Sequence, residues 1–255
     1  MIQEHNISVV IPVYGNIAYT IICLDSIAAK SKLIDEIIII DNKPDHDTFK
    51  ALADKYTLVN WYLPSINLGV SVSWDVGIKL AKNNIICVSN NDIKVLIQDW
   101  DEKLLDEWSH YPDALAFCPW PAAEETEDIE RIKKPMKGLN GSCFFIDRQG
   151  LQFTDNYKLL GQYIDHRYET AYWEDCDLLV QIRKLNKEAY VTGFNKILHY
   201  GNKTAGPMLP SDKGLHNPYW SNLDKFNKKY GTLIWDFFIV NMSNILDERT
   251  NERII

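Results

Sequence analysis

The sequence lacks any apolar run long enough to cross a bilayer. Its first residues, MIQEHNISVVIPVYG, also lack the basic segment and apolar core of a secretory leader, so we expect no signal peptide. Positive charge is scarce too: 27 Lys and Arg residues stand against 35 Asp and Glu residues, and the formal net charge is −8. This balance disfavours a general nucleic-acid-binding surface, which needs clustered positive charge, although it leaves room for a local basic groove.

The sequence also lacks cysteine pairs at metal-binding spacing. The five cysteines are scattered along the chain, and none has the CxxC spacing of a structural zinc site. Most of them lie in or beside apolar segments, so we expect reduced, mostly buried thiols in a cytoplasmic protein. They are Cys23, Cys87, Cys118, Cys143 and Cys176.

The familiar glycine-rich signatures are missing. No GxGxxG follows the first expected strand, which removes the main support for a dinucleotide-binding enzyme. The sequence has no Walker A segment and no GxSxG nucleophile elbow. The basic, glycine-rich loop of sugar nucleotidyltransferases is also absent after the first strand, and this disfavours that class of enzyme.

Apolar residues in the first hundred positions alternate between two patterns. Continuous β-branched runs predict strands buried on both faces, and apolar residues at helical spacing predict helices between them. The expected strands cover 7–14, 34–42, 58–64 and 84–90, and the expected helices cover 17–31, 47–56 and 69–83. This β-α-β order predicts a parallel sheet with right-handed crossovers, in a chain long enough to bury a sizeable core.

The second half of the chain is less regular. The expected helices cover 98–112 and 172–187, and the expected strands cover 114–121, 138–150 and 189–201. The charged stretch 122–135 is predicted to be an exposed, mobile loop. The C-terminal region is rich in aromatic side chains, which we expect to pack on the core, with a dimer contact or a membrane-surface contact as alternatives. These side chains are Tyr219, Trp220, Phe226, Tyr230, Trp235, Phe237 and Phe238.

The stretch IICVSNNDIKV at 85–95 ends an apolar run in four polar residues, 89–92. A turn is the simplest explanation, because Asn and Asp side chains hydrogen-bond their own backbone and tolerate tight bends. In parallel sheets, however, ligands bind outside the carboxyl ends of the strands, so polar residues at several strand ends predict a shared site. Those residues are Tyr14, Gly15 and Asn16; Asp41 and Asn42; and Asn90, Asn91 and Asp92.

Asp92 and His199 each follow an apolar run, in separate halves of the chain. A carboxylate and an imidazole suit Mn²⁺ or a similar divalent ion that bridges phosphates, and such an ion stabilises a diphosphate leaving group. A local hydrogen bond or cap made by His199 is the simpler explanation, and the spacing alone favours it.

The segment YWEDCDLL places Glu174, Asp175 and Asp177 at the start of an expected helix. N-capping and the helix dipole account for one or two of these acids. They account less well for Tyr172 and Trp173 directly before them. Aromatic rings beside carboxylates can hold a sugar, so these two residues are candidates for acceptor binding, and a carboxylate here can act as general base for a hydroxyl nucleophile.

Taken in order, seven segments resemble glycosyltransferase family 2, an inverting, nucleotide-sugar-dependent family with the GT-A fold. They are SVVIPVYGN, IIIIDN, NLGVSVSWDVGI, VSNND, GSCFFIDR, YWEDCDLL and ILHYG, and they extend over roughly 7–204. The resemblance implies an α/β, Rossmann-like fold: a mixed, mainly parallel sheet flanked by helices, with a C-terminal helical and aromatic extension. It implies one GT-A domain over 1–255, with a nucleotide-sugar-binding half (1–97), an acceptor-binding and catalytic half (98–204) and the extension (205–255).

The resemblance also implies which residues bind the donor. In the family, the first strand and its loop hold the nucleotide base, and the acid that ends the second strand contacts it. The NxG segment borders the nucleotide, and the short acidic motif after the fourth strand binds the metal and the diphosphate. UDP is the favoured nucleotide, with dTDP or GDP as alternatives. The matching residues are Pro12, Val13, Tyr14, Asp41, Asn67, Gly69, Asn90, Asn91 and Asp92.

For the reaction, the resemblance implies that Asp175, beside Glu174, activates an acceptor hydroxyl, and that Asp92 and His199 bind a divalent metal, Mn²⁺ or Mg²⁺. Polysaccharide biosynthesis is the family's common setting, so a glycan is the favoured acceptor. A protein or a modified nucleic-acid base is the alternative, although the acidic charge and only six arginines disfavour DNA. Peripheral membrane contact and the oligomeric state are left open.

The sequence departs from the family pattern at three positions. Asn90 replaces the first acid of the DxD motif, Trp74 is bulky where small residues are usual, and Asp75 stands where Asn is common. A transferase scaffold that binds carbohydrate with little or no catalysis is therefore a second hypothesis. The QxxRW motif of processive relatives is absent, which favours the addition of a single sugar.

Overall fold

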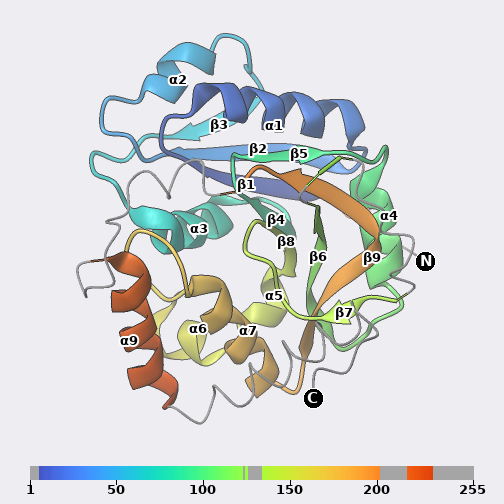
Figure 1. The fold of residues 1–255 in the computed structure, drawn as a ribbon, viewed down its shortest axis with the longest axis vertical. Coiled ribbons are helices and arrows are strands. Elements are labelled where there is room, and N and C mark those ends of the chain that lie inside the picture. Colours follow the sequence, from blue (N-terminus) through green and yellow to red (C-terminus); the bar gives the residue numbers. More distant parts are fainter. Residues whose placement is uncertain (1–5, 123, 126–133, 202–216, 232–255) are drawn as a thin grey trace.

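The computed structural model of the protein describes residues 6–122, 124–125, 134–201 and 217–231. Its centre is a nine-stranded sheet in the order β3-β2-β1-β4-β8-β6-β9-β5, with β7 paired to β9 (Figure 1). The strands are β1 (Ile7–Val13), β2 (Ile34–Asp41), β3 (Val59–Tyr62), β4 (Ile85–Ser89), β5 (Ile93–Val95), β6 (Ala114–Ala122), β7 (Met136–Lys137), β8 (Cys143–Asp147) and β9 (Glu188–His199).

The first four expected strands form the parallel part of the sheet. β1 pairs in parallel with β2 and β4, and β2 pairs in parallel with β3. Three helices connect them: α1 (Ile17–Lys30), α2 (Asp47–Leu52) and α3 (Gly69–Leu80). Alternate residues of β1 face opposite sides, since Val9 belongs to one core cluster and Val10 to the other. Burial on both faces explains why β1 and β4 are continuous apolar runs, whereas β3, at the edge of the sheet, is half exposed.

The second half of the chain extends the same sheet. β8 lies antiparallel between β4 and β6, β9 runs parallel to β6, and β5 and β7 are antiparallel to β9. β1, β2, β3, β4, β6 and β9 therefore share one direction, so the prediction of a mixed, mainly parallel sheet is confirmed. The short strands β5 and β7 were not expected, because two or three residues are too few to show a period-2 pattern.

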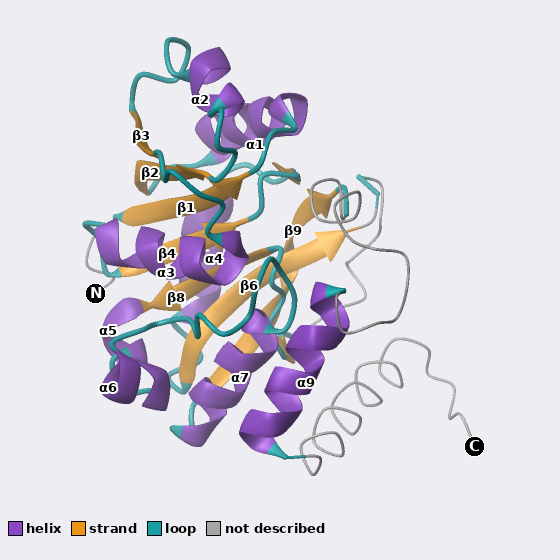
Figure 2. Ribbon diagram, turned by 90° about the vertical axis from the view of Figure 1, so that its left-hand side faces the viewer, coloured by secondary structure: helices purple, strands orange, loops and turns teal. Residues whose placement is uncertain are grey.

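Helices cover both faces of the sheet. α1 and α4 (Trp100–Trp108) pack on one face, through Leu24 and Leu104 among others. α3 and α7 (Glu174–Lys184) pack on the other face, through Ile78 and Ile182 among others. The short helices α5 (Arg148–Leu151) and α6 (Asp155–Leu160) follow β8. The last described helix, α9 (Pro218–Tyr230), lies beside α7 in both views (Figure 1, Figure 2).

Several expectations concern residues that the structure describes only in part. Of the predicted loop 122–135, residues 123 and 126–133 lie outside the described ranges, as do Trp235, Phe237 and Phe238 of the tail. The cysteines are free thiols, and all are buried except Cys176, which is half-buried. Among the described helices, none is both long enough and apolar enough to cross a bilayer.

Candidate active site

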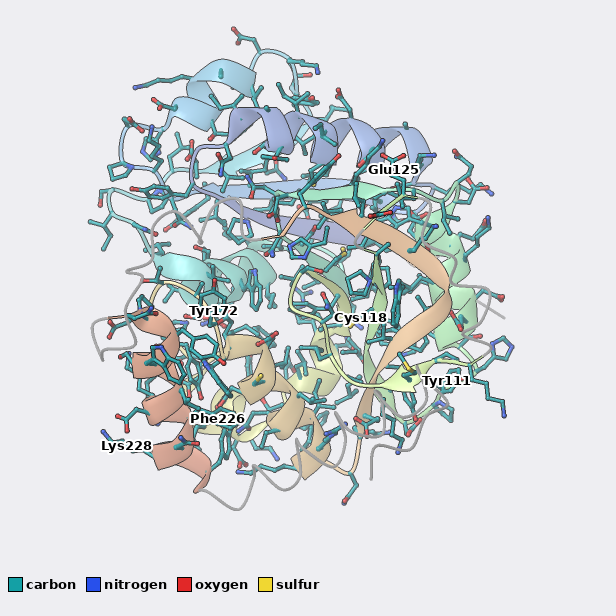
Figure 3. All side chains as sticks on the ribbon, viewed as in Figure 1. Tyr111, Cys118, Glu125, Tyr172, Phe226 and Lys228 are labelled. Carbon is teal, nitrogen blue, oxygen red and sulfur yellow. The ribbon has the colours of Figure 1, made fainter. Side chains whose placement is uncertain are left out.

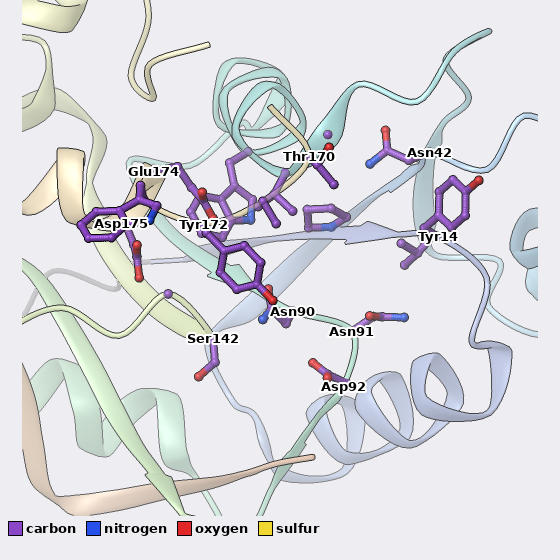
Figure 4. Close-up of a pocket in the computed structure, with 18 of the residues that line it drawn as sticks. Tyr14, Asn42, Asn90, Asn91, Asp92, Ser142, Thr170, Tyr172, Glu174 and Asp175 are labelled. Atoms are coloured by element: carbon purple, nitrogen blue, oxygen red, sulfur yellow. The ribbon is translucent and has the colours of Figure 1, made fainter. Parts of the chain in front are cut away.

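The carboxyl ends of β1, β4 and β9 border a cavity of about 560 Å³, a volume typical of small-molecule sites (Figure 4). Of the residues that the family resemblance assigns to the site, all except Asp41 line it, whereas Gly15 and Asn16, which were expected there as strand-end residues, do not. Figure 4 shows Glu174 and Asp175 on one side of the cavity and Tyr14 and Asn42 on the other. The predicted residues that line the cavity are Pro12, Val13, Tyr14, Asn67, Gly69, Asn90, Asn91, Asp92, Tyr172, Trp173, Glu174, Asp175 and His199.

The register of β5 and β9 explains how Asp92 and His199 meet. Ile93, directly after Asp92, is paired with His199, and the Tyr200 backbone N–H donates to the Asp92 carbonyl at 3.0 Å. The His199 Nε2 atom consequently lies 3.3 Å from Asp92 Oδ1. The four polar residues that end the apolar run at 85–95 are therefore more than a turn, since they lead into a second strand that brings two halves of the chain together.

The donor set fits a divalent cation. A carboxylate oxygen is an accepted ligand of both Mn²⁺ and Mg²⁺, whereas an imidazole nitrogen is typical of transition-metal ions, and the buried His199 Nε2 has no hydrogen-bond partner among the described residues. Within the same residues, no group of three or more His, Cys, Asp and Glu side chains is arranged to hold a metal ion. Asp92 and His199 would therefore leave coordination positions for diphosphate oxygens and water, which is how Mg²⁺ commonly binds in phosphate sites.

Amide side chains hold the loops around the cavity. The Asn42 amide donates to Ser73 Oγ at 2.8 Å and accepts from the Leu68 backbone N–H at 3.2 Å, which fixes the start of α3 to the end of β2. The Asn91 amide is 4% exposed and donates to Thr20 Oγ1 at 3.0 Å. These contacts position the loop backbones, so the walls of the cavity are largely preformed.

Asp41, which the resemblance implies as a contact of the nucleotide base, does not line the cavity. Its carboxylate is fully buried and accepts from the backbone N–H groups of Phe49 (2.9 Å) and Lys43 (3.3 Å). Burial raises its pKa, against the opposing effect of these two hydrogen bonds. Asp41 thus fixes the approach to α2, and it is the next residue, Asn42, that lines the cavity.

The acidic pair opens α7 without a side-chain cap. Trp173, the residue before the helix, has a φ of 75° and makes no capping hydrogen bond through its side chain. Glu174 is 6% exposed, and its Oε2 atom has no hydrogen-bond partner among the described residues. Burial, together with the charge of Asp175, raises the pKa of Glu174 to about 8. Burial raises the pKa of Asp175 as well, against the hydrogen bond that it accepts from the Cys176 backbone N–H at 2.8 Å.

The two acids share a desolvated site, in which the charge of Asp175 opposes the ionisation of Glu174. A carboxyl group whose pKa is about 8 keeps its proton at neutral pH, and burial raises the pKa of the neighbouring Asp175 above its ordinary value as well. A desolvated carboxylate with a raised pKa is a better proton acceptor than one in water. Gly141 allows a close approach to this group, since a Cβ atom there would lie 2.6 Å from Asp175 Oδ2.

An aromatic wall closes the cavity on the side of the acidic pair. The Tyr219 ring, from α9, lies 5.6 Å from the rings of both Tyr172 and Trp173. Core packing was expected for the tail, and Phe226 confirms it at 2% exposure. Tyr219 is instead 37% exposed and lines the cavity. Figure 3 shows Tyr172 and Phe226 on the inner side of α9 and Lys228 pointing outward.

Other lining residues were not predicted as site residues. They are the segment 140–142 before β8, Val70, Thr170, Ala171, Cys176 and Tyr219, whereas Asn42, which also lines the cavity, is one of the strand-end residues expected at the shared site. In the sequence, the GSCFFIDR motif begins at Gly141 and marks most of this segment as part of the family pattern, without indicating that it lines the cavity. Trp74, noted as unusual in the sequence, is 1% exposed and packs edge-on against Phe144 at 5.1 Å. Its Nε1 atom has no hydrogen-bond partner among the described residues, and the side chain lines the cavity.

Three solved structures share the fold of this chain, and two of them hold a nucleotide or sugar nucleotide together with Mn²⁺. The crystal structure of GalNAc-T7 with UDP, GalNAc and Mn²⁺ is 15% identical, with a TM-score of 0.60 over 78% of this chain and 44% of that chain. The mannosyltransferase PcManGT from Pyrobaculum calidifontis, in complex with GDP-Man and Mn²⁺, is 13% identical, with a TM-score of 0.62 over 80% of this chain and 59% of that chain. TarS 1–349 from S. aureus is 13% identical, with a TM-score of 0.56 over 75% of this chain and 59% of that chain.

These likenesses show that the chain has the GT-A fold, as the seven segments predicted. The chain spans about half the length of the structures it matches. No curated protein sequence matches it. The sequence model of glycosyl transferase family 2, however, matches residues 8–170, which is nearly two thirds of the chain. The chain therefore belongs to glycosyl transferase family 2.

Proposed function

We propose that the protein is an inverting glycosyltransferase that moves one sugar from a nucleoside-diphosphate sugar to an acceptor hydroxyl. One observation carries this proposal: a single cavity joins Asp92 and His199, which suit a metal-bound diphosphate, to Asp175, which suits a general base. Family membership supports sugar transfer from a nucleotide sugar as the general reaction.

The donor would bind at the carboxyl ends of β1 and β4, with Pro12, Val13 and Tyr14 beside the base and Asn67 and Gly69 along the nucleotide. UDP is the favoured nucleotide, and GDP is the main alternative, because structures with the same fold hold one or the other. Asp92 and His199 would hold Mn²⁺ or Mg²⁺, the positive charge of which would stabilise the diphosphate leaving group.

Asp175 would accept the proton of the acceptor hydroxyl, and the freed oxygen electron pair would form the new bond to the anomeric carbon of the donor sugar. The bond from that carbon to the diphosphate oxygen breaks at the same time, and its electron pair leaves with the nucleoside diphosphate. Because this is a single in-line displacement, the anomeric configuration inverts. Protonated Glu174 would keep a second negative charge away from the base while the cavity positions both reactants.

A glycan is the proposed acceptor. Tyr172, Trp173 and Tyr219 present aromatic rings next to Asp175, and such rings can contact the apolar face of a sugar while carboxylates and amides accept its hydroxyl groups. The net charge of −8 argues against an extended nucleic-acid acceptor.

The test combines binding and turnover. Melting temperature is measured with UDP, GDP and dTDP, each with and without Mn²⁺, and nucleoside diphosphate release is then measured from the matching sugar nucleotides. We expect one nucleotide to raise the melting temperature in a metal-dependent way and its sugar nucleotide to turn over. Binding without any release would favour the carbohydrate-binding scaffold, and no binding by a folded protein would contradict a nucleotide-sugar site.

A further inference from the structure

The loop before α7 has an unusual backbone. Thr170, Tyr172 and Trp173 all have positive φ, at 61°, 79° and 75°, although none of them is glycine. Side chains with a Cβ atom are disfavoured in this region of backbone space, so such residues persist only where the surrounding structure holds them. The loop over 168–173 must therefore be fixed by contacts outside itself.

One set of contacts comes from the start of α3. The Val70 backbone N–H donates to the Thr170 carbonyl at 2.8 Å, and Ser71 Oγ donates to the Tyr168 carbonyl at 2.5 Å. Gly69 lies against the same loop, since a Cβ atom on it would be 3.0 Å from the Thr170 nitrogen. The donor-side segment that begins at Asn67 thus holds the loop from one side.

The other set comes from a single side chain on α9. Asn222 is fully buried, and its Nδ2 atom donates to the carbonyls of Glu169 (2.8 Å), Ala171 (3.0 Å) and Tyr172 (3.2 Å). Its Oδ1 atom accepts from the Glu169 backbone N–H at 3.1 Å. Together with the α3 contacts, these bonds engage every carbonyl from 168 to 172, so a side chain about fifty residues further along the chain completes the support of the loop.

The helix that carries Asn222 is itself firmly docked. Near its C-terminal end, Lys229 Nζ contacts Asp165 at 2.7 Å and Asp177 at 2.6 Å, and both carboxylates are buried. Phe226 packs on Trp173 with ring centroids 5.3 Å apart. α9 can therefore act as a fixed support, and the loop takes its position from it.

We propose that Asn222 is a positioning residue that holds the loop over 168–173 in its left-handed conformation and thereby sets Glu174 and Asp175 against the donor side of the cavity. The effect on turnover rests on the proposed function, whereas the effect on the loop does not. The family match ends at 170, so Asn222 lies in the part of the chain that the family model does not cover.

The experiment compares two substitutions in the full chain with a control. Asn222→Ala removes all four loop hydrogen bonds, while Asn222→Asp keeps the size and the acceptor for the Glu169 N–H but has no N–H groups for the carbonyls. Leu105→Ala, in the core cluster on the opposite face of the sheet, controls for a general loss of stability. Amide hydrogen exchange is followed in peptides over 168–176 and over 85–95.

Both Asn222 variants should exchange at least about tenfold faster over 168–176, with 85–95 unchanged, and the control should show no such local change. At saturating donor, release of nucleoside diphosphate should fall about 10–100-fold in both variants, while the affinity for the nucleoside diphosphate stays within about twofold, because the misplaced group is the base and not the donor site. The donor probe is the sugar nucleotide that the wild-type protein turns over fastest.

Unchanged exchange over 168–176 in a folded Asn222 variant would overturn the proposal, and so would an equal loss of turnover in Leu105→Ala. If Asn222→Ala does not fold, the isosteric Asn222→Asp variant decides the same question. A wild-type protein without donor turnover would contradict the proposed function alone, and the exchange measurement would still decide the role of Asn222.

Discussion

The first turn of α7 holds acidic groups with opposite surroundings. The Asp177 carboxylate is surrounded by donors: Lys229 Nζ lies 2.6 Å from Oδ1, and the Asn156 amide donates to Oδ2 at 2.8 Å. Glu174 and Asp175 begin the same turn and face the cavity. Among the described residues, neither of them has an ion-pair partner, and Glu174 Oε2 has no hydrogen-bond partner.

The pKa values follow from these surroundings. Near Asp177, burial alone would raise the pKa of Asp165, yet hydrogen bonds from Arg167 and Lys229 outweigh burial and hold that pKa below its ordinary value. At the cavity, burial and the charge of Asp175 raise the pKa of Glu174 to about 8. Asp165 and Asp177 form ion pairs with Lys229 and so dock α9 onto the body of the protein. Glu174 and Asp175 have no ion-pair partner among the described residues and line the cavity. The partners of an acid therefore indicate its role better than its place in the motif.

The largest effect expected from this difference is on turnover. Asp175→Asn should lower nucleoside diphosphate release about 10²–10⁴-fold, because the amide cannot accept the acceptor proton. The melting temperature should change little, since Asp175 has no ion-pair partner to lose. Steady-state kinetics on the wild type, the variant and the exposed control Asp54→Asn would measure this. Near-normal turnover in Asp175→Asn would show that Asp175 is not the general base.

The Asp177→Asn substitution is expected to have the opposite effect, a loss of stability with turnover retained. Asp177→Asn leaves Lys229, whose side chain is 14% exposed, with Asp165 as its remaining carboxylate partner, and breaking a largely buried ion pair costs up to about 3–5 kcal/mol of unfolding free energy. Urea unfolding should show this loss, and turnover per folded molecule at low temperature should stay within a few-fold of the wild type. A large loss of turnover without a loss of stability would mean that the two acidic groups do not differ as described.

The pH dependence of the unfolding free energy tests whether the Glu174 carboxyl has a raised pKa. Between about pH 4.5 and 8 the folded protein keeps the Glu174 proton and the unfolded chain does not, so wild-type stability should fall as the pH rises through this window. Glu174→Gln has no such proton to lose. Relative to that variant, the wild type should lose on the order of 3 kcal/mol between pH 5 and pH 8. Parallel stability curves for the two proteins would show that Glu174 is ionised in the native state.

The smallest expected effect is that of Asp92→Ala on the affinity for the nucleoside diphosphate. Asp92→Ala removes one of the two proposed metal ligands, so affinity for the nucleoside diphosphate in the presence of Mn²⁺ should fall about tenfold or more, which corresponds to roughly 1.4 kcal/mol. Binding without metal should change less. Titration calorimetry with and without Mn²⁺ measures both quantities, and equal affinities for the variant and the wild type would refute the role of Asp92.

The sequence predicts the first half of the fold well, because β1 and β4 are buried on both faces and β2 is buried toward its carboxyl end, so these strands contain long apolar runs, whereas the edge strand β3 is half exposed. It also predicts most of the cavity, since the carboxyl ends of parallel strands meet at one edge of a sheet. Asp41 and Asn42 show the limit of that argument, because the direction of neighbouring side chains at a strand end depends on the turn that follows.

The contributions of α9 could not be predicted from the local pattern. YWEDCDLL shows three acids, and only the fold reveals that Lys229 neutralises one of them from 52 residues away. Asn222 looks like any polar residue of an amphipathic helix until its partners at 169–172 are known. Long-range contacts of this kind leave no periodic signal in a single sequence.

The decisive test of Asp175 as the general base measures Asp175→Asn and Asp177→Asn side by side, with melting temperature and nucleoside diphosphate release determined on the same preparations. We expect Asp175→Asn to lose turnover and keep its melting temperature, and Asp177→Asn to lose roughly 6–20 °C in melting temperature and keep its turnover when folded. If Asp175→Asn kept its turnover, or if both variants lost stability and turnover together, the assignment of Asp175 as the general base would be wrong.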